Sequence, residues 1–553
     1  MKKILVFLTL LIFTFLVGCN LSTNTTNSTE LSSESSTSNI SSSTSQTTVS
    51  TTNSRTIETE ISTTISEATE TTTEEVLDRY QEIYFYSNND FHGGAYTDYN
   101  NFSRIVNKIK TMKANNDHVI ALTNGDTLQG TPFSNYYHGK PFIEAMNIGG
   151  FDGFVIGNHE FDWGIDVIAD YKDGKEENVE ADFPFLAANI VYKDTQEHLG
   201  FTVPYIISEV NTVRVGVIGV IGDVINSIAA SRVENIEFLD PVTSIENYAT
   251  HLRTEEDVDI VVVYIHNGSD FNQDIAYLSG DARVDAVFNG HLHWNEETTI
   301  SRDGLPLAYA QVQSKDDSLL AEIKFVYDLE TESLTDVSVN NFGYSELDGE
   351  DSVVLDMFNE YQSDTEYINF VNEVLTTSEG NYYPEEMAPW GASVIRDYLG
   401  IDIGAVNRGG FRVPMFSGDV TMGDLITIYP FDNVIKTSMM TGQQITDFYK
   451  FVDDYNQDVV FDDQLTFDGY TVYINGSPID LDQLYTVGAV DYIFDKTNYD
   501  FIEGINIEYT GKFMRDLLTE DLLNSNGSFS PSDGSSYIEP LSYNYLKAFE
   551  AIV

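Results

Sequence analysis

The chain has 553 residues, enough for two or three domains of ordinary size, and 42% of them are hydrophobic, so it can bury a core. With 88 acidic residues against 28 Lys and Arg, its formal net charge is −60, which argues against a basic groove for nucleic-acid polymers. The single cysteine, Cys19, excludes an intramolecular disulfide, an iron–sulfur cluster and a cysteine-based zinc site. Any metal must therefore be held by His, Asp, Glu or Asn.

The first residues have the pattern of an export signal. Lys2 and Lys3 precede an apolar run, residues 4–17, that is too short to span a bilayer. The run ends at Leu16-Val17-Gly18-Cys19 and resembles a bacterial lipoprotein signal peptide over residues 1–19. The resemblance implies lipidation of Cys19 and an extracytoplasmic protein that is lipid-anchored to the cell membrane, at the cell surface or in a periplasm. The alternative is an ordinary secretory signal with an incidental cysteine.

Residues 20–78 are more than half Ser and Thr and contain no aromatic residue. Such a segment cannot bury enough apolar surface to offset the entropy lost on ordering. We therefore predict a disordered tether between the membrane and a folded part, with an adhesive role as the alternative.

From residue 83 onward, short apolar runs alternate with amphipathic stretches, as in layered α/β domains. Five of these runs are followed directly by polar clusters. Because sites in such folds assemble at the carboxyl ends of strands, we expect the clusters to meet there. They are Asn89-Asp90-Phe91-His92-Gly93 after 83–86, Asn124-Gly125-Asp126 after 119–122, Gly157-Asn158-His159-Glu160-Phe161-Asp162 after 154–156, His266-Asn267-Gly268 after 261–265, and Asn289-Gly290-His291-Leu292-His293 after 286–288.

Five of the nine histidines fall in these clusters. One such histidine would fit a structural role, but five at strand ends indicate a metal site. His, Asp and Asn ligands suit divalent ions such as Zn²⁺, Mn²⁺ or Fe²⁺. They are too many for one tetrahedral zinc, whereas two ions bridged by a carboxylate would use them all. Such a pair activates water and clamps a phosphoryl group, so the residues predict hydrolysis of a phosphate ester.

The clusters Asp90-x-His92, Gly125-Asp126, Gly157-Asn158-His159-Glu160, His266 and Gly290-His291-x-His293 resemble the calcineurin-like metallophosphoesterases in order and in neighbours. The longer strings, residues 89–93, 125–131 and 157–162, resemble the secreted 5′-nucleotidase branch, which includes UDP-sugar hydrolases and 2′,3′-cyclic-nucleotide phosphodiesterases. The resemblance implies an α/β fold, with a four-layer α/β/β/α metallophosphoesterase domain over residues 79–347. A linking helix over 348–372 would join it to a smaller α+β nucleotide-binding domain over 373–553.

The resemblance also implies a role for each residue of the clusters. Asp90, His92 and His293 would hold one metal, and Asn158, His266 and His291 the other, with Asp126 as the bridge. His159 would face the phosphate, stabilise negative charge and protonate the leaving oxygen. Asp162 would orient His159, and the alternative is that it is a helix cap or a surface carboxylate.

Three strings of the second domain match the family, which implies that this domain binds the nucleoside. They are Asn407-Arg408-Gly409-Gly410-Phe411-Arg412, Pro430-Phe431-Asp432-Asn433, and Asp491-Tyr492-Ile493 followed by Tyr499-Asp500-Phe501. Phe431 and Tyr492 would stack on the base. Asp500 would bind ribose hydroxyls, and Asn407, Gly409 and Arg412 would contact the substrate. The alternative is that Phe431 and Tyr492 are core aromatics.

The second domain also departs from the family pattern. Arg408 stands where the family has a glycine, and Lys496-Thr497-Asn498-Tyr499 replaces the Gly-Gly before Asp500. The family's arginine a few residues before a helix-opening Leu-Gly is absent from residues 383–391. These departures leave the hydrolytic core intact but put the preferred nucleotide in doubt.

We therefore predict a two-metal, 5′-nucleotidase-like hydrolase that releases phosphate from small nucleotides. The alternatives are a 2′,3′-cyclic-nucleotide phosphodiesterase and 3′-nucleotidase, a UDP-sugar hydrolase, and a surface lipoprotein that binds nucleotide without turnover.

Overall fold

A computed structural model describes residues 79–531 except 117, 176–178, 269–271 and 526. The predicted signal peptide, Cys19 and the predicted tether lie outside the described residues, and the described residues all belong to one compact unit, Val76–Val553. None of the described helices is long and apolar enough to cross a membrane.

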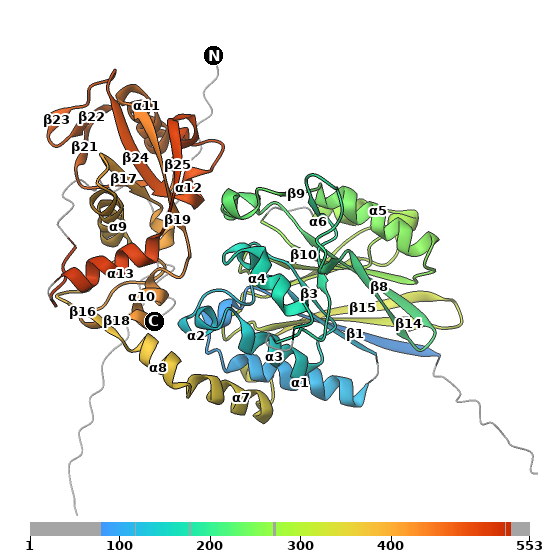
Figure 1. Cartoon of the computed structure of the whole chain (residues 1–553). Helices are drawn as coiled ribbons and strands as arrows, with labels where there is room; N and C mark the ends of the chain where they lie inside the picture. Colours follow the sequence, from blue (N-terminus) through green and yellow to red (C-terminus); the bar gives the residue numbers. More distant parts are fainter. Residues whose placement is uncertain (1–78, 117, 176–178, 269–271, 526, 532–553) are drawn as a thin grey trace, which may run out of the picture. The chain divides into compact units, whose positions relative to one another are not determined.

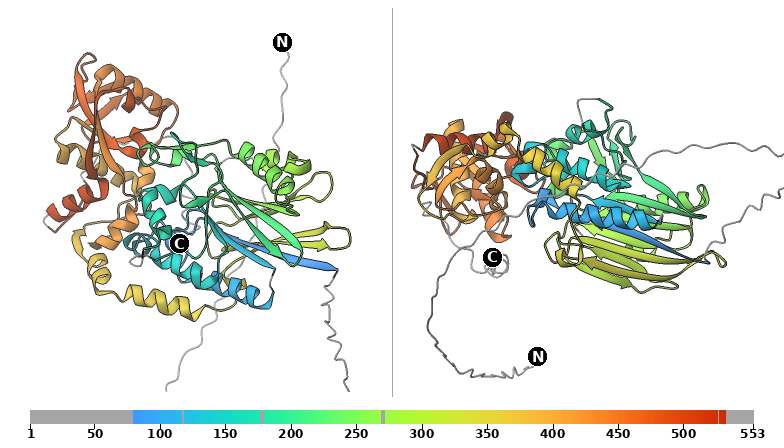
Figure 2. Two further views of the ribbon diagram at one scale, coloured as in Figure 1. Left: turned by 45° about the vertical axis from the view of Figure 1, so that its right-hand side comes forward. Right: turned by 90° about the horizontal axis from the view of Figure 1, so that it is seen from below.

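Two large β-sheets form the centre of the first lobe, which runs from β1 to β15 (Figures 1 and 2). A small sheet in the same lobe pairs β5 (Ile190–Tyr192) with β9 (Ile236–Phe238). In the first large sheet β1, β2, β3, β4 and β6 run parallel, each paired with the next, and in the second β8, β10, β11 and β13 do the same. In sheet order, the first consists of β15 (Ser333–Phe342), β14 (Leu320–Asp328), β1 (Tyr80–Asn88), β2 (Val119–Asn124), β3 (Gly153–Val155), β4 (Phe185–Leu186) and β6 (Thr202–Val203). The second consists of β12 (Glu296–Ile300), β13 (Leu307–Gln311), β11 (Ala286–Gly290), β10 (Ile260–His266), β8 (Val213–Ile221) and β7 (Tyr205–Val210).

The two sheets pack face to face, because alternate residues of their strands point into one shared core. On β1, Ile83 and Phe85 lie in this core with Val262 and Tyr264 of β10, whereas Tyr86 lies in the core on the outer face. The strands at the centre of both sheets are buried on both faces, which explains why their sequences are continuous apolar runs.

Helices cover the outer face of each sheet and complete four α/β/β/α layers. Helix α1 (Asn101–Asn115) buries Phe102, Ile105, Val106 and Ile109 against the first sheet, at the spacing of one helical face. The helices that contribute to the same core include α2 (Pro132–Tyr136), α3 (Lys140–Gly149), α4 (Ile165–Ala169) and α7 (Ser352–Gln362). Helices α5 (Pro241–Thr254) and α6 (Asn272–Tyr277) cover the second sheet. The predicted fold class is confirmed.

Two helices occupy the segment for which we predicted one linking helix: α7 and α8 (Thr365–Val371). They are separate because α7 ends at Gln362 and the carboxylate of Asp364 caps α8, accepting the N–H groups of Glu366 and Tyr367.

The second lobe runs from β16 to α13 and has its own core around a five-stranded mixed sheet. In sheet order its strands are β20 (Val460–Phe461), β17 (Ile403–Val406), β24 (Leu484–Val490), β19 (Val434–Thr441) and β25 (Ile505–Phe513). Its helices are α9 (Pro384–Leu399), α10 (Met422–Ile428), α11 (Gly442–Asp454), α12 (Asp491–Phe494) and α13 (Met514–Asn524). The smaller sheets pair β16 (Val374–Ser378) with β18 (Gly418–Thr421), and β21 (Leu465–Asp468) with β22 (Thr471–Ile474) and β23 (Ser477–Pro478).

Candidate metal centre and active site

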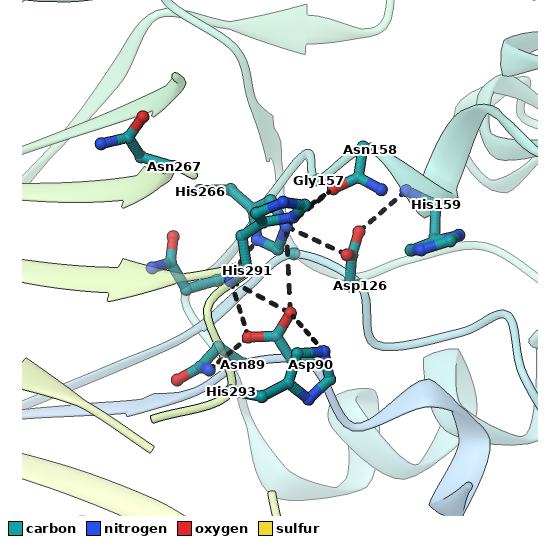
Figure 3. Close-up of polar contacts among 12 residues, drawn as sticks. Asn89, Asp90, Asp126, Gly157, Asn158, His159, His266, Asn267, His291 and His293 are labelled. Atoms are coloured by element: carbon teal, nitrogen blue, oxygen red, sulfur yellow. Dashed lines mark hydrogen bonds and ion pairs between the residues drawn. The ribbon is translucent and has the colours of Figure 1, made fainter. Parts of the chain in front are cut away.

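The predicted metal ligands come together at the carboxyl ends of five strands of the first lobe (Figure 3). Asp90 and His92 follow β1, Asp126 follows β2, and Asn158 follows β3. His266 is the last residue of β10, and His291 and His293 follow β11, where parallel pairing sets His266 beside Gly290. The side-chain amide of Asn124 donates to the carbonyls of Ile265 and Phe288, and so joins the two sheets at this edge.

Three groups of His and Asp side chains have potential ligand atoms within 4.8 Å of one another. Two of these groups match the sets predicted for the two ions, apart from Asn158. The third combines His159 with His92 and Asp126, which also belong to the other two groups. The groups are Asp90, His92 and His293; Asp126, His266 and His291; and His92, Asp126 and His159.

Backbone carbonyl groups orient two of the imidazole rings. Nδ1 of His92 lies 2.8 Å from the carbonyl oxygen of Gln129, and Nδ1 of His266 lies 2.8 Å from that of Asn124. Since a carbonyl oxygen can only accept, each Nδ1 carries the proton, which leaves the Nε2 lone pair for another partner. This is the arrangement that metal-binding histidines usually have.

Burial and neighbouring charges set the protonation of the histidines in the cluster. Burial, together with His159 and His293, holds the pKa of His92 well below its usual value, and burial with His266 lowers that of His291 to about 4. Both rings are thus neutral, as metal ligands must be. Burial also opposes charge on Asp126 and His266, but each favours the charge of the other, so the pKa of Asp126 falls and that of His266 rises to about 10. A metal ion bound at Nε2 of His266 would have to replace the proton that this pairing with Asp126 favours.

Asn158 offers its amide oxygen to the same cluster. Its Oδ1 lies 2.8 Å from Nδ1 of His291 and 3.2 Å from Nε2 of His266, while within the described chain its buried Nδ2 has no hydrogen-bond partner. A neutral oxygen ligand beside imidazoles and carboxylates suits a divalent ion of the Zn²⁺ or Mn²⁺ type, so the residues fit the predicted metals.

Several of the predicted ligands have a left-handed backbone. Of the fourteen described non-glycine residues with positive φ, five are predicted ligands: Asp90, His92, Asp126, His291 and His293. This conformation is unfavourable for L-residues, and such strain gathers at functional sites. Gly125 adjoins them with φ of 81°, and a Cβ there would lie 2.6 Å from Nδ1 of His266. The backbone of these loops therefore adopts an unfavourable conformation that brings the predicted ligands together.

His159 borders this cluster and pairs with Asp162. Nδ1 of His159 lies 2.8 Å from Oδ2 of Asp162, and the backbone N–H of His159 donates to Oδ1 of Asp126. Burial disfavours the charged ring, but Asp162 and Asp126 outweigh it and raise the pKa of His159 to about 9. A charged imidazole held in this way can stabilise negative charge and donate a proton. Its role, like that of the metal ligands, stays a prediction.

Part of the predicted nucleoside site is assembled. The guanidinium of Arg412 lies 5.8 Å from the centre of the Phe431 ring, and that ring stacks on His159 with centroids 5.9 Å apart. Arg412 also donates to the carbonyl of Gly409 and to the hydroxyl of Tyr96. Oδ1 of Asn407 is buried and lacks a hydrogen-bond partner in the described part of the chain. Phe431 and Arg412 are thus near the candidate catalytic histidine.

The charged groups that act on Asp500 are carboxylates, and they come from neither of the predicted stacking residues, Phe431 and Tyr492. Burial and the nearby carboxylates of Glu503 and Asp447 raise its pKa. Burial raises the pKa of the Tyr492 phenol, and the carboxylates of Asp458 and Asp162 raise it further. Asp458 also accepts the backbone N–H groups of Arg408 and Gly409. The ammonium of Lys496 lies 4.4 Å from the centre of the Tyr492 ring.

Sequence reasoning missed several residues around the site. Besides Asp458, Tyr96 contacts Arg412 and meets His293 edge to face at 5.0 Å. Gln129 and Asn135 both donate to the carbonyl of Pro430, which precedes Phe431. Gln129 belongs to the string of residues 125–131 that resembles the family. Nothing in the sequence around Tyr96, Asn135 or Asp458 indicated a place near the site.

Comparisons with known proteins agree with this two-lobed architecture. The family model "Calcineurin-like phosphoesterase" matches residues 88–295, and "5′-nucleotidase, C-terminal domain" matches residues 348–503. The chain is 26% identical to an apyrase of Tabanus yao over 63% of this chain and 67% of the apyrase. It is 24% identical to the trifunctional nucleotide phosphoesterase protein YfkN of Bacillus subtilis, over 62% of this chain but only 26% of that protein. A 5′-nucleotidase precursor of Thermus thermophilus aligns over 81% of this chain and 97% of its own, at 19% identity with a TM-score of 0.63.

Fold and site thus define a two-domain phosphoesterase. Residues 88–295 belong to the calcineurin-like phosphoesterases, and residues 348–503 form a 5′-nucleotidase C-terminal domain. The predicted family is confirmed, and with it the predicted class of hydrolase. The described residues also include three His/Asp groups that could hold the divalent metals such enzymes use.

Proposed function

We propose that the protein releases phosphate from nucleotides in the manner of a 5′-nucleotidase, with two divalent ions bound in the candidate site. The observation that carries this proposal is the place of His159, which borders the His/Asp cluster and also stacks on Phe431 of the second lobe. A group that can act on phosphate thus lies beside a ring that can stack on a base.

The proposed ligands are those assigned above: Asp90, His92 and His293 for one ion, Asn158, His266 and His291 for the other, and Asp126 for both. Ions bound in such sites activate water and offset charge on a phosphoryl group. The chain's own residues do the rest. Asp162 holds the ring of His159, which donates to the leaving oxygen, and Arg412 supplies positive charge at the substrate. Phe431 and Tyr492 stack on the base.

The test is phosphate release by the fragment from residue 79 onward, stripped of metal and reloaded with Mn²⁺, Zn²⁺ or Co²⁺. The substrates are AMP, UDP-glucose, 2′,3′-cyclic AMP and bis(p-nitrophenyl) phosphate, with a coupling phosphatase for UDP-glucose and the cyclic nucleotide. We expect metal-dependent turnover, with AMP as the best substrate. A preference for the cyclic nucleotide or the UDP-sugar would favour those alternatives, and binding without turnover of any substrate would favour the non-catalytic lipoprotein.

The same panel run with Phe431→Ala separates a nucleotidase from a general phosphoesterase. Loss of a base–aromatic stack of about 1–3 kcal/mol should raise KM for AMP about 5- to 150-fold. Glycerol 2-phosphate, which has neither a base nor an aromatic ring, is added as the control, and its KM should stay near the wild-type value. An equal rise for both substrates would count against base stacking by Phe431.

Lipid anchoring at Cys19 is part of the proposal, supported by the sequence alone. The anchored protein should appear in the membrane fraction of its native host. The Cys19→Ser variant should move to the soluble fraction, because a hydroxyl does not take the thioether-linked lipid. A variant that stays in the membrane fraction would contradict the anchor.

A further inference from the structure

Glu160 is a fully buried carboxylate directly behind the metal cluster. In the described part of the chain no Lys or Arg side chain pairs with it. A buried carboxylate is costly unless hydrogen bonds satisfy its oxygens. Three backbone N–H groups do so: Oε2 accepts from Asp126 at 2.9 Å and from Gly157 at 2.8 Å, and Oε1 accepts from Thr127 at 3.2 Å.

These three donors come from two different loops, of which Figure 3 labels Asp126 in the first and Gly157 in the second. Asp126 and Thr127 belong to the loop after β2, and Gly157 immediately precedes Asn158 in the loop after β3. Glu160 therefore ties the loop of the bridging carboxylate to the loop that carries the amide ligand. It does so at the backbone of Asp126, where φ is 52° and the chain needs support to keep a left-handed conformation.

The two loops also touch each other closely. A Cβ added at Gly157 would lie 2.4 Å from Oδ1 of Asp126 and 2.9 Å from Oε2 of Glu160. There is thus no room for a side chain between the loops, and their separation is fixed by the shared carboxylate. An amide side chain would not replace it fully, because only one of its two terminal atoms accepts a hydrogen bond.

We propose that Glu160 is a positioning residue that sets the distance between Asp126 and Asn158 and thereby the affinity of the site for its divalent ions. The inference rests on the metal site of the proposed function, but it concerns binding of the ions and not turnover.

The test is the affinity of the Glu160→Gln variant for Zn²⁺ and Mn²⁺, measured by competition with a chromogenic chelator. We expect each affinity to fall about 10- to 100-fold, as it does when partners of metal ligands are changed. The metal-free variant should melt close to the metal-free wild type, because two of the three N–H groups can still reach the amide oxygen. Wild-type affinity in a folded Glu160→Gln protein would overturn the proposal.

Asp285→Asn is the matched control. Asp285 is also a buried carboxylate of the first lobe that accepts a backbone N–H, from Val261, but it pairs with Arg253 and contacts neither loop. This variant should lower the melting temperature and leave metal affinity unchanged. A similar loss of affinity in both variants would mean that Glu160 acts only through general stability, and would overturn the proposal.

A second variant decides the matter if Glu160→Gln does not fold. Gly157→Ala keeps the carboxylate but forces the loops apart, so it should weaken metal binding as well, and unchanged affinity would overturn the proposal. The outcomes also separate this inference from the proposed function. A wild-type protein that binds metal without hydrolysing any substrate would defeat the function alone, whereas an active enzyme with unaltered affinity in the variants would defeat the inference alone.

Discussion

Replacing His159 by alanine is expected to lower kcat about 10²- to 10⁴-fold while both metal ions remain bound. The imidazole lies beside the cluster, its ring centre 4.9 Å from that of His92, and Asp162 holds it on the other side. The bond from His159 to Asp126 comes from the backbone N–H and survives the substitution. The variant therefore loses the acid and the positive charge without loosening the loop.

The measurement is kcat for AMP together with metal content by mass spectrometry. His138→Ala is a suitable control, because His138 packs edge to face on Trp163 and its contact with Tyr171 uses its backbone carbonyl. It should keep a near wild-type kcat. Loss of metal from His159→Ala would show that His159 is itself a ligand, an arrangement that its closeness to His92 and Asp126 permits.

Asp126→Asn should have a similarly large effect through the opposite route, by loss of the metals themselves. Asp126 belongs to two of the three ligand groups, and its Oδ2 lies 3.0 Å from Nε2 of His266. The amide has nearly the same shape but lacks the negative charge with which Asp126 would bridge the two proposed cations. Since changes even to partners of ligands cost 10- to 100-fold in affinity, we expect a loss of more than about 100-fold.

This second prediction is checked by equilibrium dialysis against buffered Zn²⁺ and by turnover at saturating metal. Asp152→Asn provides the comparison, since Asp152 pairs with Lys113 and accepts the N–H of Ala121 away from the cluster. It should retain full metal content. Stoichiometric binding of two ions by Asp126→Asn would exclude Asp126 as the bridge.

The strand-end clusters could be predicted because two local signals coincide there. A buried parallel strand reads as an apolar run, and its carboxyl end is marked by Gly, Asn and His. Hence all five predicted strands exist and their clusters meet. The break between α7 and α8 could also be predicted from the sequence, because aspartate is a favoured N-cap residue and Asp364 caps α8.

The remaining parts of the site could not be read in this way, because they depend on contacts between distant segments. Glu160 lies in the motif of residues 157–162, but nothing in the sequence indicates that it accepts the backbone N–H groups of residues 126 and 127. Asp458 approaches the loop at Arg408 from 50 residues away. Asp500, by contrast, was placed by analogy with a glycine-rich string that this chain lacks, and its carboxyl has acidic neighbours.

The left-handed backbone at five predicted ligands also limits how this centre can be redesigned. Asn and Gly tolerate such a conformation, whereas β-branched residues do not. Libraries that randomise Asp90, His92, Asp126, His291 and His293 would therefore lose many members to misfolding before any new chemistry could be screened. Exchange of the preferred ion is better sought at Asn158 and His266, which are absent from the positive-φ residues and so leave the designer a wider choice of side chains.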